Sequence, residues 1–225
     1  MAEIIIALDV PAAEARRLLD RIPEARWVKV GSILFADEGP AFVRELIARG
    51  LSVFLDLKWH DIPNTVAGAV ARARDLGVTM ASVHASGGRA MLEAAARAAG
   101  DSLGVVGVTV LTSHTPDSYA AAAGRERVDL VVEVGRLAAL AFESGLRGVV
   151  CSPLEVPTVR THARPGAWII SPGIRRSSDP AGDQARTASP ANAVSAGATH
   201  LVLGRPILAA ADPRSVYREV EGEAT

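Results

Sequence analysis

The chain has 225 residues, 49% of them hydrophobic, which is enough for one large buried core. Its formal net charge of -1 argues against the basic surface of a nucleic-acid-binding protein and against an acidic, disordered chain. The single cysteine, Cys151, excludes an internal disulfide, and its apolar neighbours predict a buried, unreactive thiol.

The first residues carry no sign of a targeting segment. The apolar run Ile4-Ile5-Ile6 has no basic region before it, and Asp9 ends it too early for a signal peptide. No stretch approaches the length of a membrane span. We therefore expect a cytoplasmic protein in a reducing compartment, without a membrane partner.

Short apolar runs alternate with segments of helical periodicity along the whole chain, a pattern typical of repeated βα units. Such a pattern predicts a single-domain (β/α)8 TIM barrel covering residues 1–225. A doubly wound sheet is the alternative, but the first strand is followed by Asp9-Val10-Pro11 rather than by a Gly-rich dinucleotide fingerprint. We expect eight strands, near residues 3–9, 27–31, 52–58, 79–84, 103–111, 147–152, 167–171 and 199–204.

Apolar residues at helical spacing predict helices between these strands. The helix after the sixth strand is the least distinct, because Pro153 and Pro157 crowd its start. The three clearest helical faces are Phe42, Val43, Leu46 and Ile47; then Val66, Ala69, Val70 and Ala73; then Leu130, Val131, Val134, Leu137 and Ala138.

The segment from Phe54 to Val66 concentrates charge where an apolar strand turns into a helix that Pro63 opens. Side chains alternate along a strand, so Asp56 and Lys58 are expected to point the same way, with Asp61 in the turn that follows. Two carboxylates would then bracket one ammonium. The structural alternative is an ion pair that plugs the barrel mouth, with Asp61 capping a helix.

Other polar residues stand at the expected C-terminal ends of strands, where barrels of this type collect function. Alternatives remain for each: Asp9 as a cap of the first helix, His84 as a hydrogen-bonded rim histidine, and Ser113 as a loop serine. Their shared location supports a common site. The candidates at these ends are Asp9, Lys29, His84, Thr112, Ser113 and Arg205.

Only two of the 24 basic residues are lysines, Lys29 and Lys58, and the others are arginines. An arginine binds anions but does not give up a proton near neutral pH, whereas a lysine donates one and is recharged. A required acid would therefore stay lysine in an arginine-rich chain. Chance survival of both lysines is the alternative.

Residues 172–189 are rich in Gly, Ser, Asp and Arg and are longer than most βα connections, as is typical of a lid. The loops after strands seven and eight are where such barrels usually bind a phosphate. Arg205, next to Gly204, would supply the cation there. An ordinary surface arginine is the alternative.

The Phe54–Val66 segment resembles the signature of the orotidine 5'-phosphate decarboxylase family. The pattern D-x-K-x-x-D-I-x-x-T is filled by Asp56, Lys58, Asp61, Ile62 and Thr65. The similarity covers nearly the whole chain, including Ser-Pro-Gly-Ile-Arg from residue 171, Asp-Gln-x-Arg from residue 183 and the terminal Val-Leu-Gly-Arg-Pro-Ile. Arg176 and Ser189 depart from the family pattern, in or beside the expected lid.

The resemblance implies a cofactor-free decarboxylation of orotidine 5'-phosphate, with neither a cofactor nor a metal. Lys58 would protonate the pyrimidine carbon C6, and Asp56 would stand close to the departing carboxylate. Asp61 would be a catalytic residue contributed, with Thr65, across the interface of a homodimer. The remaining substrate-binding residues that it implies are Asp9 and Lys29 at the ribose, Thr112 and Ser113 at the pyrimidine, Gln184 and Arg205 at the phosphate, and Pro172 and Gly204 beside them.

Two alternatives to this function remain. The first is a magnesium-dependent 3-keto-gulonate 6-phosphate decarboxylase or a related aldolase, which also uses Asp-x-Lys-x-x-Asp. The second is a barrel that binds a nucleotide without turning it over. Metal dependence separates the first from the favoured function, and turnover separates the second.

Overall fold

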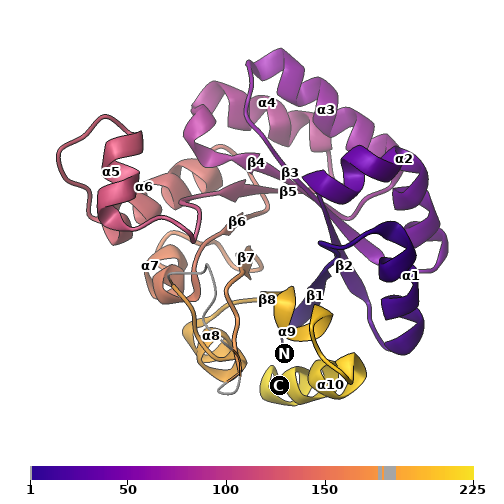
Figure 1. Ribbon diagram of the computed structural model, residues 1–225. Coiled ribbons are helices and arrows are strands. Elements are labelled where there is room, and N and C mark those ends of the chain that lie inside the picture. Colours follow the sequence, from indigo (N-terminus) through magenta and orange to yellow (C-terminus); the bar gives the residue numbers. More distant parts are fainter. Residues whose placement is uncertain (1, 177–178, 180–185) are drawn as a thin grey trace.

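The predicted barrel is present in the computed structural model, which describes residues 2–176, 179 and 186–225. Within this part of the chain, eight parallel strands close into a barrel in sequence order, with β1 paired to both β2 and β8. Figure 1 shows the helices arranged around the outside of these strands. The strands are β1 (Glu3–Ala7), β2 (Trp27–Gly31), β3 (Ser52–Trp59), β4 (Met80–His84), β5 (Gly104–Val108), β6 (Gly148–Val150), β7 (Trp168–Ser171) and β8 (His200–Leu203).

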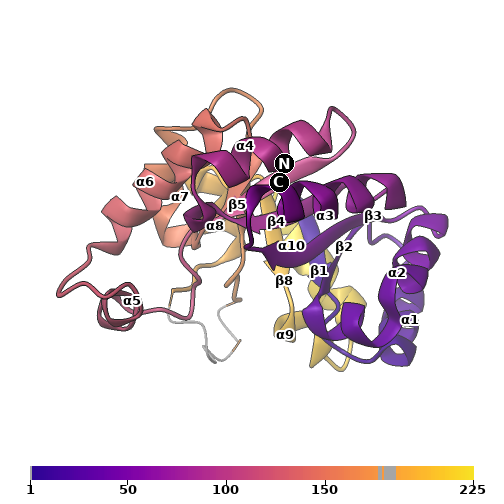
Figure 2. The ribbon, with the colours of Figure 1, turned by 90° about the horizontal axis from the view of Figure 1, so that it is seen from above.

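Helices follow the strands as the periodicity predicts, and short additional helices follow several strands directly. Figure 2 shows α5 and α9, which follow β5 and β8, on the side of the barrel opposite to the chain termini. The helices are α1 (Ala12–Arg21), α2 (Ser32–Ala48), α3 (Pro63–Leu76), η1 (Ala85–Gly87), α4 (Arg89–Ala99), α5 (Pro116–Ala122), α6 (Leu130–Glu143), η2 (Pro153–Glu155), α7 (Val156–Arg160), α8 (Pro190–Ala196), α9 (Arg205–Leu208) and α10 (Pro213–Glu223).

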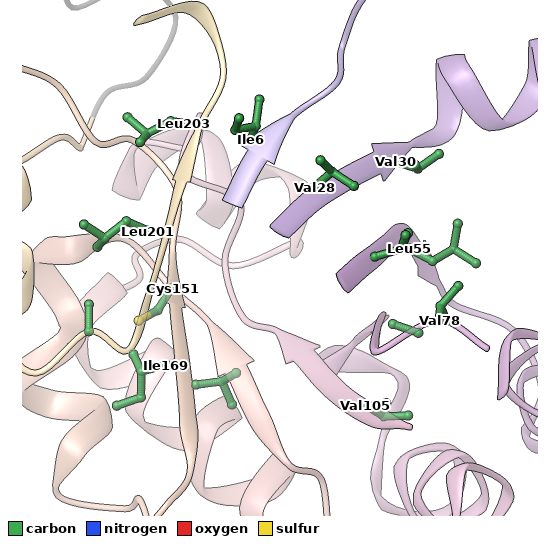
Figure 3. Close-up of a cluster of buried hydrophobic side chains, with 14 of the residues drawn as sticks. Ile6, Val28, Val30, Leu55, Val78, Val105, Cys151, Ile169, Leu201 and Leu203 are labelled. Atoms are coloured by element: carbon green, nitrogen blue, oxygen red, sulfur yellow. The ribbon is translucent and has the colours of Figure 1, made fainter. Parts of the chain in front are cut away.

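The main core lies between the barrel and its helices. Strand residues that face outward pack against the helices, and Figure 3 shows Ile6, Val28, Leu55 and Leu203 among them. A second cluster, with Phe54 at 1% exposure, fills the barrel interior. Burial on both faces explains why these strands read as continuous apolar runs rather than as alternating ones.

Local signals in the sequence fix several helix ends. Pro63 begins α3, as predicted, and α3 ends at Gly77, whose left-handed backbone (φ 88°) suits a residue without a side chain. After β6 the chain forms only the short η2 and α7, in agreement with the crowding by Pro153 and Pro157. The prediction that Val131 belongs to the apolar face of its helix was wrong, since Val131 is 47% exposed.

Six of the eight strands are one to four residues shorter than predicted, β1 and β5 among them. β1 ends at Ala7 rather than at residue 9, and β5 ends at Val108 rather than at residue 111. The residues just beyond these ends leave the sheet and contribute to the mouth of the barrel. They include Asp9 and Thr112, so the candidate polar residues stand on loops that the strands position.

Candidate active site at the C-terminal ends of the strands

A cavity of about 510 Å³ opens at the C-terminal ends of the strands. Its floor is apolar and includes Phe54, Val108, Val150 and Val202, each of which comes from a different strand. The wall is polar and contains most of the residues predicted from the sequence. These are Asp9, Lys29, Asp56, Lys58, Thr112, Ser113, Pro172, Gly204 and Arg205.

Four of these residues form a chain of alternating charge across β1, β2 and β3. Lys29 Nζ lies 3.0 Å from Asp9 Oδ1 and 3.7 Å from Asp56 Oδ2. Asp56 Oδ2 in turn lies 2.8 Å from Lys58 Nζ. Asp9 therefore contacts Lys29 rather than capping the first helix, whose N-cap is Pro11 with no side-chain cap bond.

Asp56 is the more buried of the two acids in this charge network, with a side chain 9% exposed against 51% for Asp9. Burial works to raise its pKa, but the ammonium groups of Lys29 and Lys58 outweigh it and hold the pKa of Asp56 below its usual range. Asp56 is therefore an anion at neutral pH. An ionised carboxylate at the cavity wall keeps both lysines nearby.

Gly31, at the end of β2, leaves the space that this network occupies. A side-chain carbon at position 31 would come within 3.2 Å of both Asp9 Oδ1 and Lys29 Nζ. These approaches are tighter than ordinary van der Waals contact. A glycine here lets the ion pair close over the strand end.

The backbone of Lys58 is unusual. It has φ 51°, and among the described residues it is the only one other than glycine with a positive φ. A long side chain in this left-handed region costs roughly 1–3 kcal/mol, and such strain concentrates at functional sites. In this backbone conformation the Lys58 ammonium contacts Asp56, at a point where the regular pairing of β3 with β4 is interrupted.

Ser82, on β4, supports this arrangement and was not singled out from the sequence. Its hydroxyl donates to Asp56 Oδ1 at 2.8 Å and accepts from the Lys58 backbone N–H at 2.9 Å. Ser82 is fully buried. A serine within a short apolar strand carries no sequence signal of such contacts, so only the structure reveals them.

Asp61 and Thr65 are not brought to this cavity within one chain. Both are exposed, and Asp61 Oδ1 accepts from the N–H of the next residue, Ile62, at 2.6 Å. Among the described residues, Lys58 has one carboxylate within 4.0 Å, that of Asp56. Within one chain, Lys58 therefore has the Asp56 carboxylate beside it but not that of Asp61.

The opposite side of the cavity is cationic. Arg205 and Gly204 follow β8, and Arg175 follows β7 on the same wall. Arg175 was not singled out in the sequence analysis, although it lies within the Ser-Pro-Gly-Ile-Arg motif. Two guanidinium groups on one wall, remote from the Lys58 end, can bind an anion.

Within the predicted lid, residues 172–189, the structure describes residues 172–176, 179 and 186–189. Ile174 pairs with Ala188 in an isolated parallel bridge, and Ser189 caps α8 through the Asn192 N–H. Arg186 forms a buried ion pair with Glu155 and donates to the carbonyl of Leu111 at 2.9 Å. These contacts fix the C-terminal end of the segment. Gln184 lies outside the described residues.

Neither a metal-binding cluster nor a membrane-spanning helix is formed by the described residues. No three His, Cys, Asp or Glu side chains gather there in an arrangement that would bind a metal ion. No described helix is both long enough and apolar enough to cross a bilayer. Cys151 is 1% exposed beneath the cavity, and burial raises the pKa of its thiol, in agreement with the predicted unreactive cysteine.

Comparisons with known proteins agree with this geometry. The model of the orotidine 5'-phosphate decarboxylase / HUMPS family matches residues 2–220. The orotidine 5'-phosphate decarboxylase of Halorhodospira halophila is 48% identical over 98% of this chain and 94% of its own, and that of Moorella thermoacetica is 46% identical over 98% and 91%. The crystal structure of orotidine 5'-phosphate decarboxylase from Lactobacillus acidophilus superposes with a TM-score of 0.88 at 33% identity and covers 100% of both chains. The chain therefore belongs to the orotidine 5'-phosphate decarboxylase / HUMPS family.

Proposed function

We propose that this chain is an orotidine 5'-phosphate decarboxylase that forms uridine 5'-phosphate in pyrimidine biosynthesis without a cofactor. The observation that carries the proposal is the alternating network Asp9, Lys29, Asp56 and Lys58 on the wall of a cavity with an apolar floor. Relatives that carry this name match the chain at 46–48% identity over more than nine tenths of its length. Orotidine 5'-phosphate is the proposed partner, in the cytoplasm, and no nucleic acid or membrane is required.

The chemistry that we propose proceeds at the Lys58 end of the cavity. The bond between C6 and the carboxylate breaks, CO₂ leaves, and the electron pair stays on C6, where no neighbouring group accepts it. The Lys58 ammonium faces this developing negative charge and stabilises it. A proton then passes from Lys58 Nζ to C6, and solvent recharges the amine.

Asp56 has two proposed roles in this step. As a buried anion 2.8 Å from Lys58 Nζ, it holds the ammonium in place. It would also stand near the substrate carboxylate, where repulsion would raise the energy of the bound substrate and fall away as CO₂ departs. The low pKa of Asp56 supports the charged form that both roles need.

The cationic wall would bind the substrate phosphate, which is remote from C6. Arg205 and Arg175 supply positive charge, and Gln184 is proposed to join them from the lid. Binding energy from a remote phosphate can order the site and close a lid over the reacting end. Loss of this contact should therefore reduce turnover as well as affinity. We propose that Asp9 and Lys29 contact the ribose and that Thr112 and Ser113 contact the pyrimidine.

The exposed turn after β3 supports a homodimer with shared active sites. Ile62 is 66% exposed beside Asp61 and Thr65, and Ile33 is 73% exposed at the start of α2. An interface between two copies of this chain would remove these apolar side chains from water. We propose that Asp61 and Thr65 complete the cavity of a second copy of this chain and give Lys58 its second carboxylate.

The direct test is to mix purified protein, orotidine 5'-phosphate and EDTA and to record the ultraviolet spectrum. Conversion to uridine 5'-phosphate in the presence of the chelator supports the proposal. No conversion of orotidine 5'-phosphate, together with decarboxylation of 3-keto-gulonate 6-phosphate that stops with EDTA and returns with Mg²⁺, would favour the magnesium-dependent sugar-phosphate alternative. Nucleotide binding without any spectral change would favour the non-catalytic barrel.

Two variants assign the roles. Lys58→Ala should abolish product formation while uridine 5'-phosphate still binds, and retained turnover would contradict its role as the acid. Mixing Lys58→Ala chains with Asp61→Ala chains should recover part of the activity, because each dimer with one chain of either variant carries one intact site. Confirmed mixed dimers without activity would contradict the shared site.

A further inference from the structure

The pairing between β3 and β4 is interrupted next to the reacting end of the cavity. Leu55 pairs with Ala81, and the next pair joins Trp59 to Val83. Three residues of β3, at positions 56–58, therefore face a single residue of β4, Ser82. Such a bulge re-aims side chains and leaves backbone groups without their ladder partners.

Ser82 occupies the gap that the bulge creates. Its hydroxyl contacts both ends of the three-residue segment, the Asp56 carboxylate at 2.8 Å and the Lys58 backbone N–H at 2.9 Å. The side chain is fully buried on the interior side of β4, so water does not replace either contact. One hydroxyl thus substitutes for the regular pairing of the strand.

The two oxygens of Asp56 are used for different purposes. Oδ1 accepts from Ser82, whereas Oδ2 faces Lys58 Nζ at 2.8 Å and Lys29 Nζ at 3.7 Å. A donor on Oδ1 fixes the rotation of the carboxylate and leaves Oδ2 directed at the cations. The same hydroxyl also holds the backbone from which the Lys58 side chain starts.

We propose that Ser82 is a positioning residue that sets the geometry of the Asp56–Lys58 pair by bridging the β3 bulge. It does not line the cavity, so it acts through Asp56 and Lys58 rather than by touching the substrate. Its consequence for catalysis rests on the proposed decarboxylase function. Its consequence for geometry does not.

The test compares three variants with the full-length wild type. Ser82→Ala removes the hydroxyl, and Ser82→Cys keeps a similar volume but offers only a weak donor and acceptor. Ser144→Ala is the matched control, because Ser144 is also a buried hydroxyl, 4% exposed, and lies at the C-terminal end of α6. Thermal unfolding of each variant verifies folding.

We expect kcat to fall by about tenfold to a hundredfold in both Ser82 variants, which corresponds to about 1.4–2.7 kcal/mol of transition-state stabilisation. Affinity for uridine 5'-phosphate should stay within about threefold of the wild type, because no cavity residue is lost. Ser144→Ala should keep both values. Normal kcat in Ser82→Cys would attribute any loss in Ser82→Ala to packing volume and would overturn the proposal.

The pH profile supplies a readout that lost packing would not move. Ser82 donates to the ionised form of Asp56, so its removal raises the pKa of Asp56 and shifts the acid limb of kcat to higher pH. The other charged or titratable groups facing Asp56 are Lys29 on β2, Lys58 on β3 and His84 on β4, and all three stay in place. An unmoved acid limb in both Ser82 variants would contradict the proposal.

Crystal structures of the wild type and Ser82→Ala separate this proposal from the proposed function. We expect Lys58 Nζ to leave hydrogen-bond distance of Asp56, beyond about 3.5 Å, whatever reaction the protein performs. A wild type without decarboxylase activity would refute the function alone. An unchanged Asp56–Lys58 contact and an unchanged left-handed Lys58 in the variant would refute the role of Ser82.

Discussion

Replacing Lys29 by methionine tests whether the charge network stabilises the fold as well as the site. Methionine keeps an unbranched side chain of similar length and removes only the ammonium. In the wild type that ammonium lies 3.7 Å from the Asp56 carboxylate, and the two side chains are 11% and 9% exposed. The substitution therefore leaves a buried anion with one cation in place of two.

The size of the effect follows from these distances. At 3.7 Å, the attraction between two unit charges is about 4 kcal/mol at an effective dielectric constant near 20. Lys58 still compensates Asp56 at 2.8 Å, so we expect a loss of about 2–3 kcal/mol in the free energy of unfolding, below the usual cost of breaking a buried pair. Asp9 adds less than about 1 kcal/mol, because its side chain is 51% exposed.

The effect also depends on pH. Asp56 has a folded-state pKa below its ordinary 3.8, so its contribution is present above that value and disappears as pH falls through the folded-state pKa. Removing Lys29 raises the folded-state pKa of Asp56. The loss of stability on acidification should therefore begin at a higher pH in Lys29→Met than in the wild type.

The assay is urea unfolding of the wild type, Lys29→Met, Asp56→Asn and the double variant at one protein concentration, since the stability of the proposed dimer would depend on concentration. The double-mutant cycle should give a coupling energy of about 2–3 kcal/mol between Lys29 and Asp56. A coupling energy near zero would refute the argument. So would a loss below about 1 kcal/mol in Lys29→Met.

Three further outcomes are expected. Arg205→Ala should weaken binding of uridine 5'-phosphate far more than binding of uridine in calorimetry, and equal losses would remove the phosphate assignment. Glu133, hydrogen-bonded to Arg136 and Arg125, has its pKa lowered to about 2, so its contribution is present above its ordinary 4.5 and lost between there and pH 2. In urea unfolding, the free energy of unfolding should therefore fall less on acidification in Glu133→Gln than in the wild type. Because both arginines are at least half exposed, we expect this difference to be only about 1–2 kcal/mol, and an identical pH dependence would contradict the pairing. Cys151 should resist an aromatic disulfide reagent in the native protein and react after unfolding, whereas rapid native labelling would contradict its burial.

The barrel could be predicted from the sequence because each strand is an apolar run between polar ends. The exception at β5 shows what such runs do not distinguish. The apolar pattern continues to residue 111, although pairing ends at Val108. Val110 is 2% exposed and belongs to the hydrophobic core, and the carbonyls of Val110 and Leu111 accept from Arg186 instead of from a strand. A sequence does not distinguish a buried apolar residue whose backbone pairs with a neighbouring strand from one whose backbone does not.

The polar residues of the site were predictable as a group, but their contacts were not. Strand alternation indicated that Asp56 and Lys58 lie together, and they do. Alternation contains no information on the bulge that gives Lys58 its positive φ, or on Ser82, which spans it. Alternation also gives no direction for Asp61, since side-chain direction in a turn depends on backbone angles that residue types alone do not determine.

The survival of two lysines in an arginine-rich chain has different reasons at the two positions. Lys58 lies on the cavity wall with a side chain 35% exposed, where an amine can give a proton to a bound molecule and be recharged. Lys29 is 11% exposed and lies between two carboxylates, close to where a side chain on Gly31 would stand. A planar guanidinium is wider than an ammonium and would have to displace one of these neighbours. Arginine is therefore excluded at position 29 by the lack of space for its guanidinium, and at position 58 by the need for a side chain that can transfer the proposed proton.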